Sequence, residues 1–232
     1  EQLAATQRIQ EAGGFEAFLL HGVTGSGKTE VYLELIKGCL RRGQSALVLV
    51  PEIGLTPQTI RRFEERLGVS VSPWHSALSA TERLDVWWGL QRPGPKVLVG
   101  ARSALFCPLK ELGVIIIDES HDGSYKQGEG VRYHARDMGV LRASLEGCPV
   151  VMGSATPSLE CLQNARLGRY VHLQLHQRPL GAELPSVRLI DLKVTRTVSD
   201  DAPAFSQPLA QAIRACLQRG EQAILYLNRR GF

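Results

Sequence analysis

The chain contains no long hydrophobic segment. Its longest apolar runs, such as residues 46–50, are far shorter than the roughly 20 residues that a membrane-spanning helix needs. The opening residues EQLAATQRIQ are polar and contain no apolar signal region. The sequence therefore predicts a cytoplasmic protein without a membrane partner.

Cysteine is scarce, and its spacing does not suit a metal site. The five cysteines stand at positions 39, 107, 148, 161 and 216, and none forms a C-x-x-C pair. Such pairs are typical of structural zinc sites, and a chain of this size and cysteine content does not need a disulfide framework. We therefore expect reduced thiols and no zinc within this chain.

Neither sign of charge dominates the sequence. The 232 residues carry a net charge of +4, with 44% hydrophobic and 22% charged residues. This ordinary globular composition can bury a core, and its mild basicity permits nucleic acid as a partner without requiring it. Because the chain does not begin with Met, we expect it to be a piece of a longer protein.

Short apolar runs alternate with helical patterns along the first 178 residues. Residues 32, 35, 36, 39 and 40 form one apolar helical stripe, and Ser79 and Glu82 have the spacing of a helix capping box. The apolar runs are typical of parallel strands that are buried on both faces. They cover residues 18–20, 46–50, 96–99, 114–117 and 149–152. The alternation predicts an open, mostly parallel α/β sheet.

The pattern changes after residue 178. Turn-rich stretches surround strand-like residues 187–192, a helix-like segment at 208–219 and strand-like residues 223–227. One helix and two strands are too little for a stable domain. We therefore predict one domain over residues 1–178, with residues 179–232 forming a linker and the start of a second lobe.

The octapeptide GVTGSGKT, residues 22–29, fits the phosphate-loop pattern G-x-x-x-x-G-K-[ST] between the first apolar run and the first helical stripe. Glycines turn backbone N–H groups toward phosphate oxygens, and the start of a helix adds its own unpaired donors. Lys28 offers a cation to the β- and γ-phosphates, and Thr29 offers a hydroxyl to Mg²⁺. The alternative is an ordinary glycine-rich turn.

Two carboxylates, Asp118 and Glu119, directly follow the apolar run 114–117. Ligands of an open parallel sheet bind outside the carboxyl ends of its strands, where the phosphate loop also lies. Asp118 can then hold Mg²⁺ through its water shell, and Glu119 can orient the attacking water. The alternative is a solvated strand end or a helix cap. His121 either has a structural role or forms a hydrogen bond across the nucleotide site. Its spacing from the acidic pair does not decide between these two roles.

Three motifs together resemble a known family. GVTGSGKT, DESH (residues 118–121) and GSATP (residues 153–157) resemble motifs I, II and III of superfamily 2 helicases. The strings LVPEIGLTPQT, RYHARD and LNRRGF narrow the resemblance to the bacterial primosomal replication-restart helicases, over nearly the whole chain. The resemblance implies a RecA-like P-loop NTPase lobe, followed by a partial second RecA-like lobe.

The resemblance also implies roles for individual residues around bound ATP. Asp118 and Glu119 match the pair that serves Mg²⁺ and water, although Ser120 replaces an acid in the family's DEEH. Gln2 stands where such helicases often place an adenine-reading glutamine. The residues that match the ATP-phosphate loop are Gly25, Ser26, Gly27, Lys28 and Thr29.

Two further segments match parts that couple ATP to DNA in related helicases. Ser154, Ala155 and Thr156 match the motif that links the ATP state to DNA. An aromatic-rich loop after motif II contacts single-stranded DNA in these enzymes, and here it carries stacking rings and cations. Its candidates are Tyr125, Lys126, Arg132, Tyr133 and His134. The alternative is a loop whose tyrosines pack on their own lobe. Trp87 and Trp88 lie in an apolar helical pattern, and we expect them in the core.

The resemblance implies an ATP-dependent 3′-to-5′ DNA helicase that remodels abandoned replication forks. Its implied partners are single-stranded and forked DNA and the primosome and replication-restart proteins, in the bacterial cytoplasm at the nucleoid. The family's fork-binding domains, its zinc-binding cysteines and its arginine finger are expected in the remainder of the family's chain.

Three alternatives stay open. One is another superfamily 2 nucleic-acid translocase, and another is a P-loop small-molecule kinase. The third is an ATP-binding interaction module without turnover. The order of DESH and GSATP argues against the kinase. The intact Lys28, Thr29, Asp118 and Glu119 argue against the module.

We predict that the purified 232-residue chain holds no stoichiometric zinc, because its cysteine spacings contain no zinc-binding pattern. Elemental analysis checks this. One zinc per chain would contradict the prediction.

We also predict that the isolated 232-residue chain binds Mg·ATP weakly, hydrolyses it negligibly and unwinds nothing. Superfamily 2 helicases hydrolyse ATP between two lobes, and an arginine from the second lobe can contribute about 10³–10⁵ in rate, by analogy with other P-loop enzymes. The measurement is phosphate release with excess single-stranded or forked DNA. Robust DNA-stimulated turnover would show that this chain already contains the catalytic arginine.

Overall fold

The computed structural model describes residues 1–177, 186–193, 195 and 205–226. The chain divides into two compact units, Glu1–Ala182 and Glu183–Phe232. All the site residues that the sequence predicts belong to the first unit.

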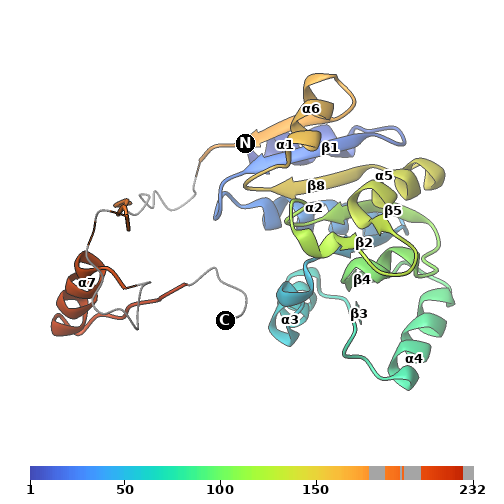
Figure 1. The fold of residues 1–232 in the computed structure, drawn as a ribbon. Coiled ribbons are helices and arrows are strands. Elements are labelled where there is room, and N and C mark those ends of the chain that lie inside the picture. Colours follow the sequence, from blue (N-terminus) through green and yellow to red (C-terminus); the bar gives the residue numbers. More distant parts are fainter. Residues whose placement is uncertain (178–185, 194, 196–204, 227–232) are drawn as a thin grey trace. The chain divides into compact units, whose positions relative to one another are not determined.

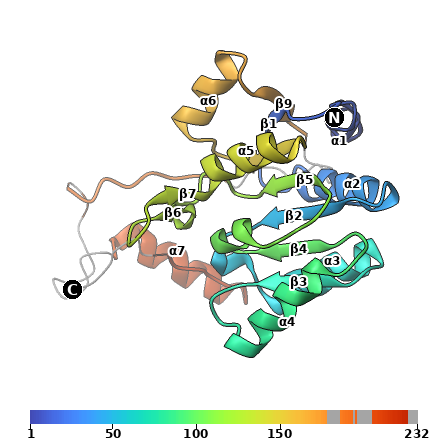
Figure 2. The same cartoon turned by 90° about the vertical axis from the view of Figure 1, so that its right-hand side faces the viewer.

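A seven-stranded sheet forms the centre of the first unit (Figure 1). Its strands follow the order β3-β4-β2-β5-β8-β1-β9, and each neighbouring pair is parallel. Figure 2 shows them stacked from β3 at one edge toward β1 and β9 at the other. The strands are β1 (Ala17–Gly22), β2 (Ser45–Leu49), β3 (Val71–Trp74), β4 (Val97–Gly100), β5 (Leu112–Ile117), β8 (Val150–Ser154) and β9 (Val171–Leu175). The predicted parallel α/β sheet is confirmed.

Helices cover both faces of this sheet. One face packs against α1 (Gln2–Gln10), α2 (Lys28–Arg41) and α3 (Pro57–Leu67). The other face packs against α4 (Ala80–Gln91), α5 (Ala135–Glu146) and α6 (Leu159–Arg166). Three short 3₁₀ turns lie between elements, at Glu52–Gly54, Arg102–Phe106 and Gly123–Tyr125. Within the described ranges, no helix is long and apolar enough to cross a bilayer.

The central strand β5 explains the continuous apolar runs in the sequence. Val114 and Ile116 pack on the α1–α3 face, whereas Ile115 and Ile117 pack on the α4–α6 face, and all four are buried. Side chains alternate across a strand, so a strand that is covered on both faces must be apolar at every position. Each such burial contributes roughly 1.5–3 kcal/mol. Polar residues return only at Asp118, where the strand leaves the core.

The start of α4 has the predicted capping box. The N–H of Glu82 donates to Ser79 Oγ (3.3 Å), and the N–H of Ser79 donates to the Glu82 carboxylate (2.8 Å). The prediction that Trp87 and Trp88 lie in the core is wrong, because their exposed fractions are 38% and 58%. Of the side chains of α4, only Leu90 is buried, since this helix packs beside the edge strand β3 rather than over the middle of the sheet.

The sequence patterns do not predict the edge strands β3 and β9. Edge strands are covered less completely than central ones, so they lack a continuous apolar run. β3 contains Pro73, which an edge tolerates because it has a free hydrogen-bonding side. A short antiparallel hairpin, β6 (Lys126–Gln127) paired with β7 (Tyr133–His134), is also absent from the prediction.

In the second unit the structure describes one helix, α7 (Gln207–Gln218), close to the helix predicted at 208–219. Ser206 caps it by accepting the N–H of Leu209. The strands predicted at 187–192 and 223–226 are wrong, and residue 227 lies outside the described residues. A strand needs a neighbour to complete its backbone hydrogen bonds, and these segments have none in the described part of this unit. The assignment of residues 179–232 to the start of a second lobe stays a prediction.

Candidate functional site

The site lies at the carboxyl-terminal end of the sheet, where three neighbouring strands end. This end is called the sheet edge of the site, as distinct from the edge strands β3 and β9. The order β5-β8-β1 places the ends of these strands side by side. Residues 22–29 follow β1, Asp118 and Glu119 follow β5, and the segment 154–156 follows β8. The carboxyl ends of parallel strands lie on the same side of the sheet. Three segments that are distant in sequence therefore meet there.

The phosphate loop has the backbone shape that its glycines allow. Gly25 and Gly27 have φ values of +79° and +86°, in the left-handed region that side chains rarely adopt. Gly27 is the N-cap of α2, so the unpaired N–H groups of the helix start face the loop. This arrangement suits a bound anion.

Two polar side chains in the loop fit a ligand that carries phosphate. Lys28 is 8% exposed, and its Nζ donates to the carbonyl of Gly22 (2.8 Å). The Ser26 hydroxyl is buried and has no hydrogen-bond partner among the described residues. Such a group costs about 1–3 kcal/mol when left unpaired, so a ligand that bonds to it would remove that cost.

Gln2 lies directly against this loop. Its Nε2 donates to the carbonyl of Ser26 (2.9 Å), and a Cβ on Gly27 would come within 2.0 Å of that nitrogen. The structure therefore brings Gln2 to the site from the start of the chain. Its adenine-reading role stays a prediction.

The acidic pair faces a pocket of about 490 Å³. Thr29, Asp118 and Glu119 all line it. The backbone of Glu119 has φ +44°, a left-handed conformation that costs a non-glycine residue of order 1–3 kcal/mol and is concentrated at functional sites. The hydroxyl of Thr29 and the carboxylate of Asp118 are oxygen ligands, which Mg²⁺ prefers, so the residues present fit Mg·ATP.

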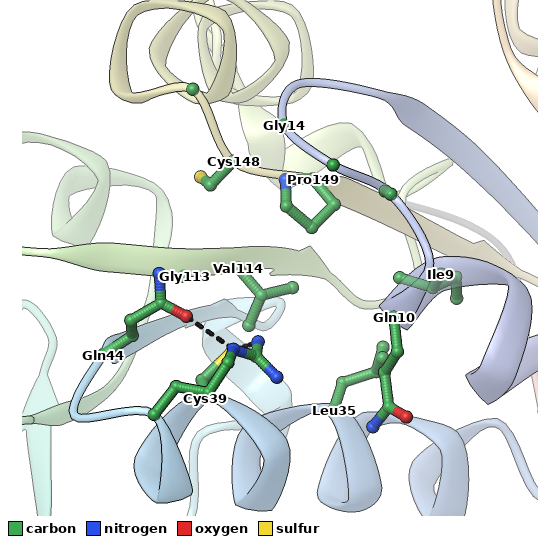
Figure 3. Close-up of a pocket in the computed structure, with 14 residues that line it drawn as sticks. Ile9, Gln10, Gly14, Leu35, Cys39, Gln44, Gly113, Val114, Cys148 and Pro149 are labelled. Atoms are coloured by element: carbon green, nitrogen blue, oxygen red, sulfur yellow. Dashed lines mark hydrogen bonds between the residues drawn. The ribbon is translucent and has the colours of Figure 1, made fainter.

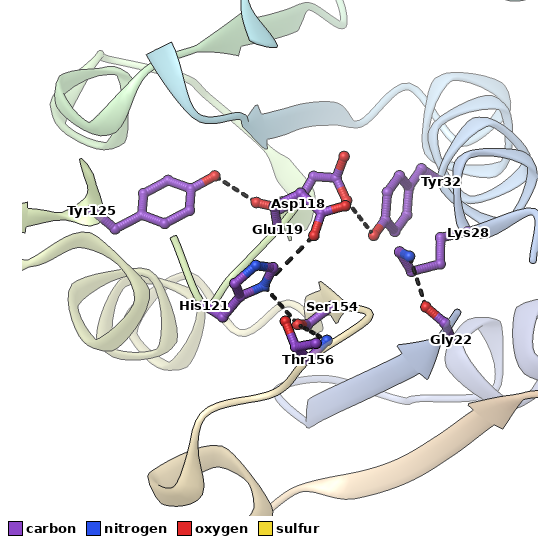
Figure 4. Close-up of polar contacts among 9 residues, drawn as sticks. All are labelled: Gly22, Lys28, Tyr32, Asp118, Glu119, His121, Tyr125, Ser154 and Thr156. Carbon is purple, nitrogen blue, oxygen red and sulfur yellow. Dashed lines mark hydrogen bonds and ion pairs between the residues drawn. The ribbon is translucent and has the colours of Figure 1, made fainter. Parts of the chain in front are cut away.

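His121 connects the acidic pair to the segment after β8 (Figure 4). Its Nδ1 lies 3.5 Å from Glu119 Oε2 and 2.8 Å from Ser154 Oγ. Ser154 Oγ also accepts the N–H of Thr156 (3.0 Å). A continuous polar path therefore runs from Glu119 through His121 and Ser154 to Thr156. His121 therefore bonds across the site, and its predicted role in reporting the state of a bound nucleotide stays a prediction.

Two buried tyrosines donate hydrogen bonds to Asp118, and the sequence patterns predict neither contact. Tyr32 donates to Asp118 Oδ1 (2.9 Å), and Tyr125 donates to the backbone carbonyl of Asp118 (2.7 Å). Burial, followed by the charge of Asp118, raises the pKa of both phenols, so both stay protonated. The sequence pattern places Tyr32 only on the apolar stripe of α2, and no local signal identifies Asp118, 86 positions away, as its partner.

The loop after the acidic pair is partly different from its prediction. Tyr125 is fully buried, so its predicted role as a stacking face for DNA is wrong. Lys126 and Arg132 are exposed on the β6–β7 hairpin. Tyr133 is half-buried against Phe106, with ring centroids 5.2 Å apart. Their DNA contacts stay a prediction.

His134 has a structural role in the hairpin. Its Nδ1 accepts the N–H of Arg136 and caps α5. Burial, with a smaller contribution from the charge of Arg136, lowers the pKa of His134, which favours the neutral ring at neutral pH. Its contact with DNA stays a prediction.

A separate pocket of about 310 Å³ lies at the opposite end of the sheet (Figure 3). It is lined by residues that precede the strands, including Gly14, Gln44 and Pro149. Burial raises the pKa of the Cys148 thiol there to about 12, so the thiol is protonated. This pocket is distinct from the phosphate loop and the acidic pair.

No group of three or more His, Cys, Asp or Glu side chains that could hold a metal occurs in the described part of the chain. The absence of zinc stays a prediction for the whole chain.

Comparison with known proteins gives the family. Residues 1–165 match the family model of the DEAD/DEAH box helicases. The chain belongs to the DEAD/DEAH box helicase family. The phosphate loop, the acidic pair and the segment 154–156 all lie inside the matched region.

Curated relatives are similar over the full chain. The chain is 46% identical to Replication restart protein PriA of Bacillus subtilis and 45% identical to that of Haemophilus influenzae, with 100% of this chain covered in each case. It spans only 29% and 31% of the length of these relatives.

Solved structures share the fold. The chain superposes on RecG bound to a three-way DNA junction with a TM-score of 0.60 and 23% identity, over 94% of this chain and 28% of that one. The Hef helicase domain of Pyrococcus furiosus gives a TM-score of 0.55 and 19% identity, over 75% of this chain and 37% of that one. At these identities the likeness supports the helicase fold alone.

We predict that Lys28→Ala weakens Mg·ATP binding to the 232-residue chain by about 10- to 100-fold, because it removes a charged hydrogen-bond donor from the phosphates. Calorimetric titration measures the affinity, and circular dichroism verifies the fold. Lys37→Ala is the matched control, since Lys37 is on the same helix but pairs with Glu34. Unchanged affinity in a folded Lys28→Ala variant would contradict the assignment.

Proposed function

We propose that this chain is the ATP-binding part of an ATP-dependent 3′-to-5′ DNA helicase that acts in replication restart. The observation that carries the proposal is the meeting of three segments at one sheet edge, joined by the polar path from Glu119 to Thr156. The similarity to Replication restart protein PriA over the whole chain supports the biological role.

The side chains of the site divide the chemistry of ATP hydrolysis among them. When ATP binds, Lys28 Nζ leaves the Gly22 carbonyl and donates to the β- and γ-phosphates instead. The N–H groups at the start of α2 bind the phosphate oxygens. Thr29 and Asp118 hold Mg²⁺, which neutralises charge on the phosphates when bound. Glu119 orients the attacking water and accepts its proton.

The polar path can transmit a change at the ATP site to the segment 154–156, which is proposed to respond to nucleic acid. A change at Glu119 alters the contact with His121 Nδ1, and that nitrogen also bonds to Ser154. Thr156 then moves with Ser154, because its N–H donates to the Ser154 hydroxyl. Arg102 supports the neighbouring hairpin, since its guanidinium donates to the carbonyls of Ser124 and Lys126 (2.9 and 2.8 Å). We infer that exposed Lys126 and Arg132 contact the phosphates of single-stranded DNA.

The proposal places this chain within a longer enzyme. Residues 179–232 are the proposed beginning of a second helicase lobe. The relatives are about three times longer than the matched region, which leaves room for the zinc site, the arginine finger and fork-binding domains. Single-stranded and forked DNA and the primosome proteins are the proposed partners, in the bacterial cytoplasm at the nucleoid.

ATP turnover by the longer protein, measured with and without nucleic acid, tests the proposal. Stimulation by single-stranded and forked DNA, together with unwinding of 3′-tailed rather than 5′-tailed duplexes, is expected. Preference for RNA would point to another superfamily 2 translocase. Binding of ATP without any turnover would point to an interaction module.

We predict that Glu119→Gln in the longer protein retains ATP binding but lowers turnover by roughly two or more orders of magnitude, because the amide cannot accept the proton of water. Steady-state phosphate release and a separate ATP-binding titration measure the two effects. Glu65→Gln is the control, since Glu65 is exposed on α3. Near-normal turnover of Glu119→Gln would show that another group activates the water.

A further inference from the structure

Tyr32 lies one helical turn beyond the phosphate loop and points back toward it. Its exposed fraction is 1%, and its hydroxyl donates to Asp118 Oδ1 at 2.9 Å (Figure 4). Side chains on a helix lean toward its N-terminus, so a tyrosine at the start of the second turn of α2 can reach the end of β5, where Asp118 follows.

The environment of this hydroxyl keeps it a donor. A carboxylate oxygen accepts hydrogen bonds, so the proton of this bond comes from the phenol. The neutral phenol therefore has one proton to donate, and Asp118 Oδ1 accepts it. One carboxylate oxygen is thus held by α2, while the other remains for a ligand.

Gly153 leaves the space that the hydroxyl occupies. A Cβ at this position would lie 1.6 Å from Tyr32 Oη and 2.9 Å from Cζ, which no ordinary packing allows. Its carbonyl also accepts the N–H of Ser120, two residues after Asp118. The phosphate-loop helix, the acidic strand end and the end of β8 therefore meet at one phenol oxygen.

Tyr125 holds the same residue from another side. It donates to the backbone carbonyl of Asp118 (2.7 Å), and this contact leaves the carboxylate free to rotate. Only the bond from Tyr32 fixes the orientation of the carboxylate among the contacts found within the described residues.

We propose that Tyr32 is a positioning residue: its hydroxyl holds the Asp118 carboxylate in the orientation that binds Mg²⁺, and it fits there because residue 153 has no side chain. The inference rests on the proposed function, because it takes Asp118 as a Mg²⁺ site. Residues that orient a metal ligand through a hydrogen bond typically change metal affinity about 10- to 100-fold when they are removed. The contribution of Tyr32 is therefore to Mg²⁺ affinity rather than to contact with the nucleotide.

The first test is a Mg²⁺ titration of the 232-residue chain with a fluorescent ATP analogue. Tyr32→Phe is expected to raise the half-saturating Mg²⁺ concentration about 10-fold, and to leave nucleotide affinity in EDTA unchanged. Tyr170→Phe is the control for loss of a phenol hydroxyl elsewhere, since Tyr170 packs beside α6 on the opposite face of the sheet. An equal Mg²⁺ midpoint in Tyr32→Phe and wild type would overturn the inference.

The second test needs neither metal nor nucleotide. Gly153→Ala is expected to lower the thermal midpoint of unfolding more in the wild-type background than in Tyr32→Phe, because the hydroxyl is the atom nearest to the added methyl group. Equal losses in both backgrounds would overturn the part of the inference that concerns Gly153. If the wild-type chain does not bind nucleotide in a Mg²⁺-dependent way, the proposed function fails instead. Failure of the Tyr32 inference and failure of the proposed function are therefore distinguishable.

Discussion

The site depends on the parallel arrangement of β5, β8 and β1 as neighbours in the sheet. This arrangement brings the phosphate loop, the acidic pair and the segment 154–156 to one edge, although they are separated by dozens of residues in sequence. Buried apolar side chains on both faces hold the strands in register, so the edge is a rigid platform. The polar side chains of the site therefore keep fixed positions relative to one another, because the strands that carry them are held by a close-packed core.

The polar groups of the site differ in how many hydrogen-bond partners the protein gives them. Asp118 receives two tyrosine hydroxyls and His121 bonds to Ser154, so the acidic end is ordered by the protein itself. In the phosphate loop, by contrast, the hydroxyl of Ser26 has no partner among the residues described, and Lys28 is held by a backbone carbonyl. One half of the site is prearranged, and the other half has bonding capacity for a ligand.

The boundary between buried and exposed aromatic residues follows from position in the sheet rather than from residue type. Tyr125 lies close to β5 and is sequestered, whereas Trp88 lies on a helix beside the edge strand and is 58% exposed. The sequence suggested the reverse for both residues. An amphipathic pattern shows that a helix has an apolar face, but the number of strands beneath the helix decides how much of that face is covered.

Local sequence patterns are enough to predict the central strands, the phosphate loop, the acidic strand end and the capping box of α4. Each depends on interactions within a few residues or on burial on both faces, and both leave a local pattern. The strand order, the edge strands, the exposure of the tryptophans and the bonds of Tyr32 and Tyr125 to Asp118 become visible only in the folded chain. These depend on which segments become neighbours. The contact between Tyr32 and Asp118 joins residues 86 positions apart, a separation at which no local spacing can specify a partner.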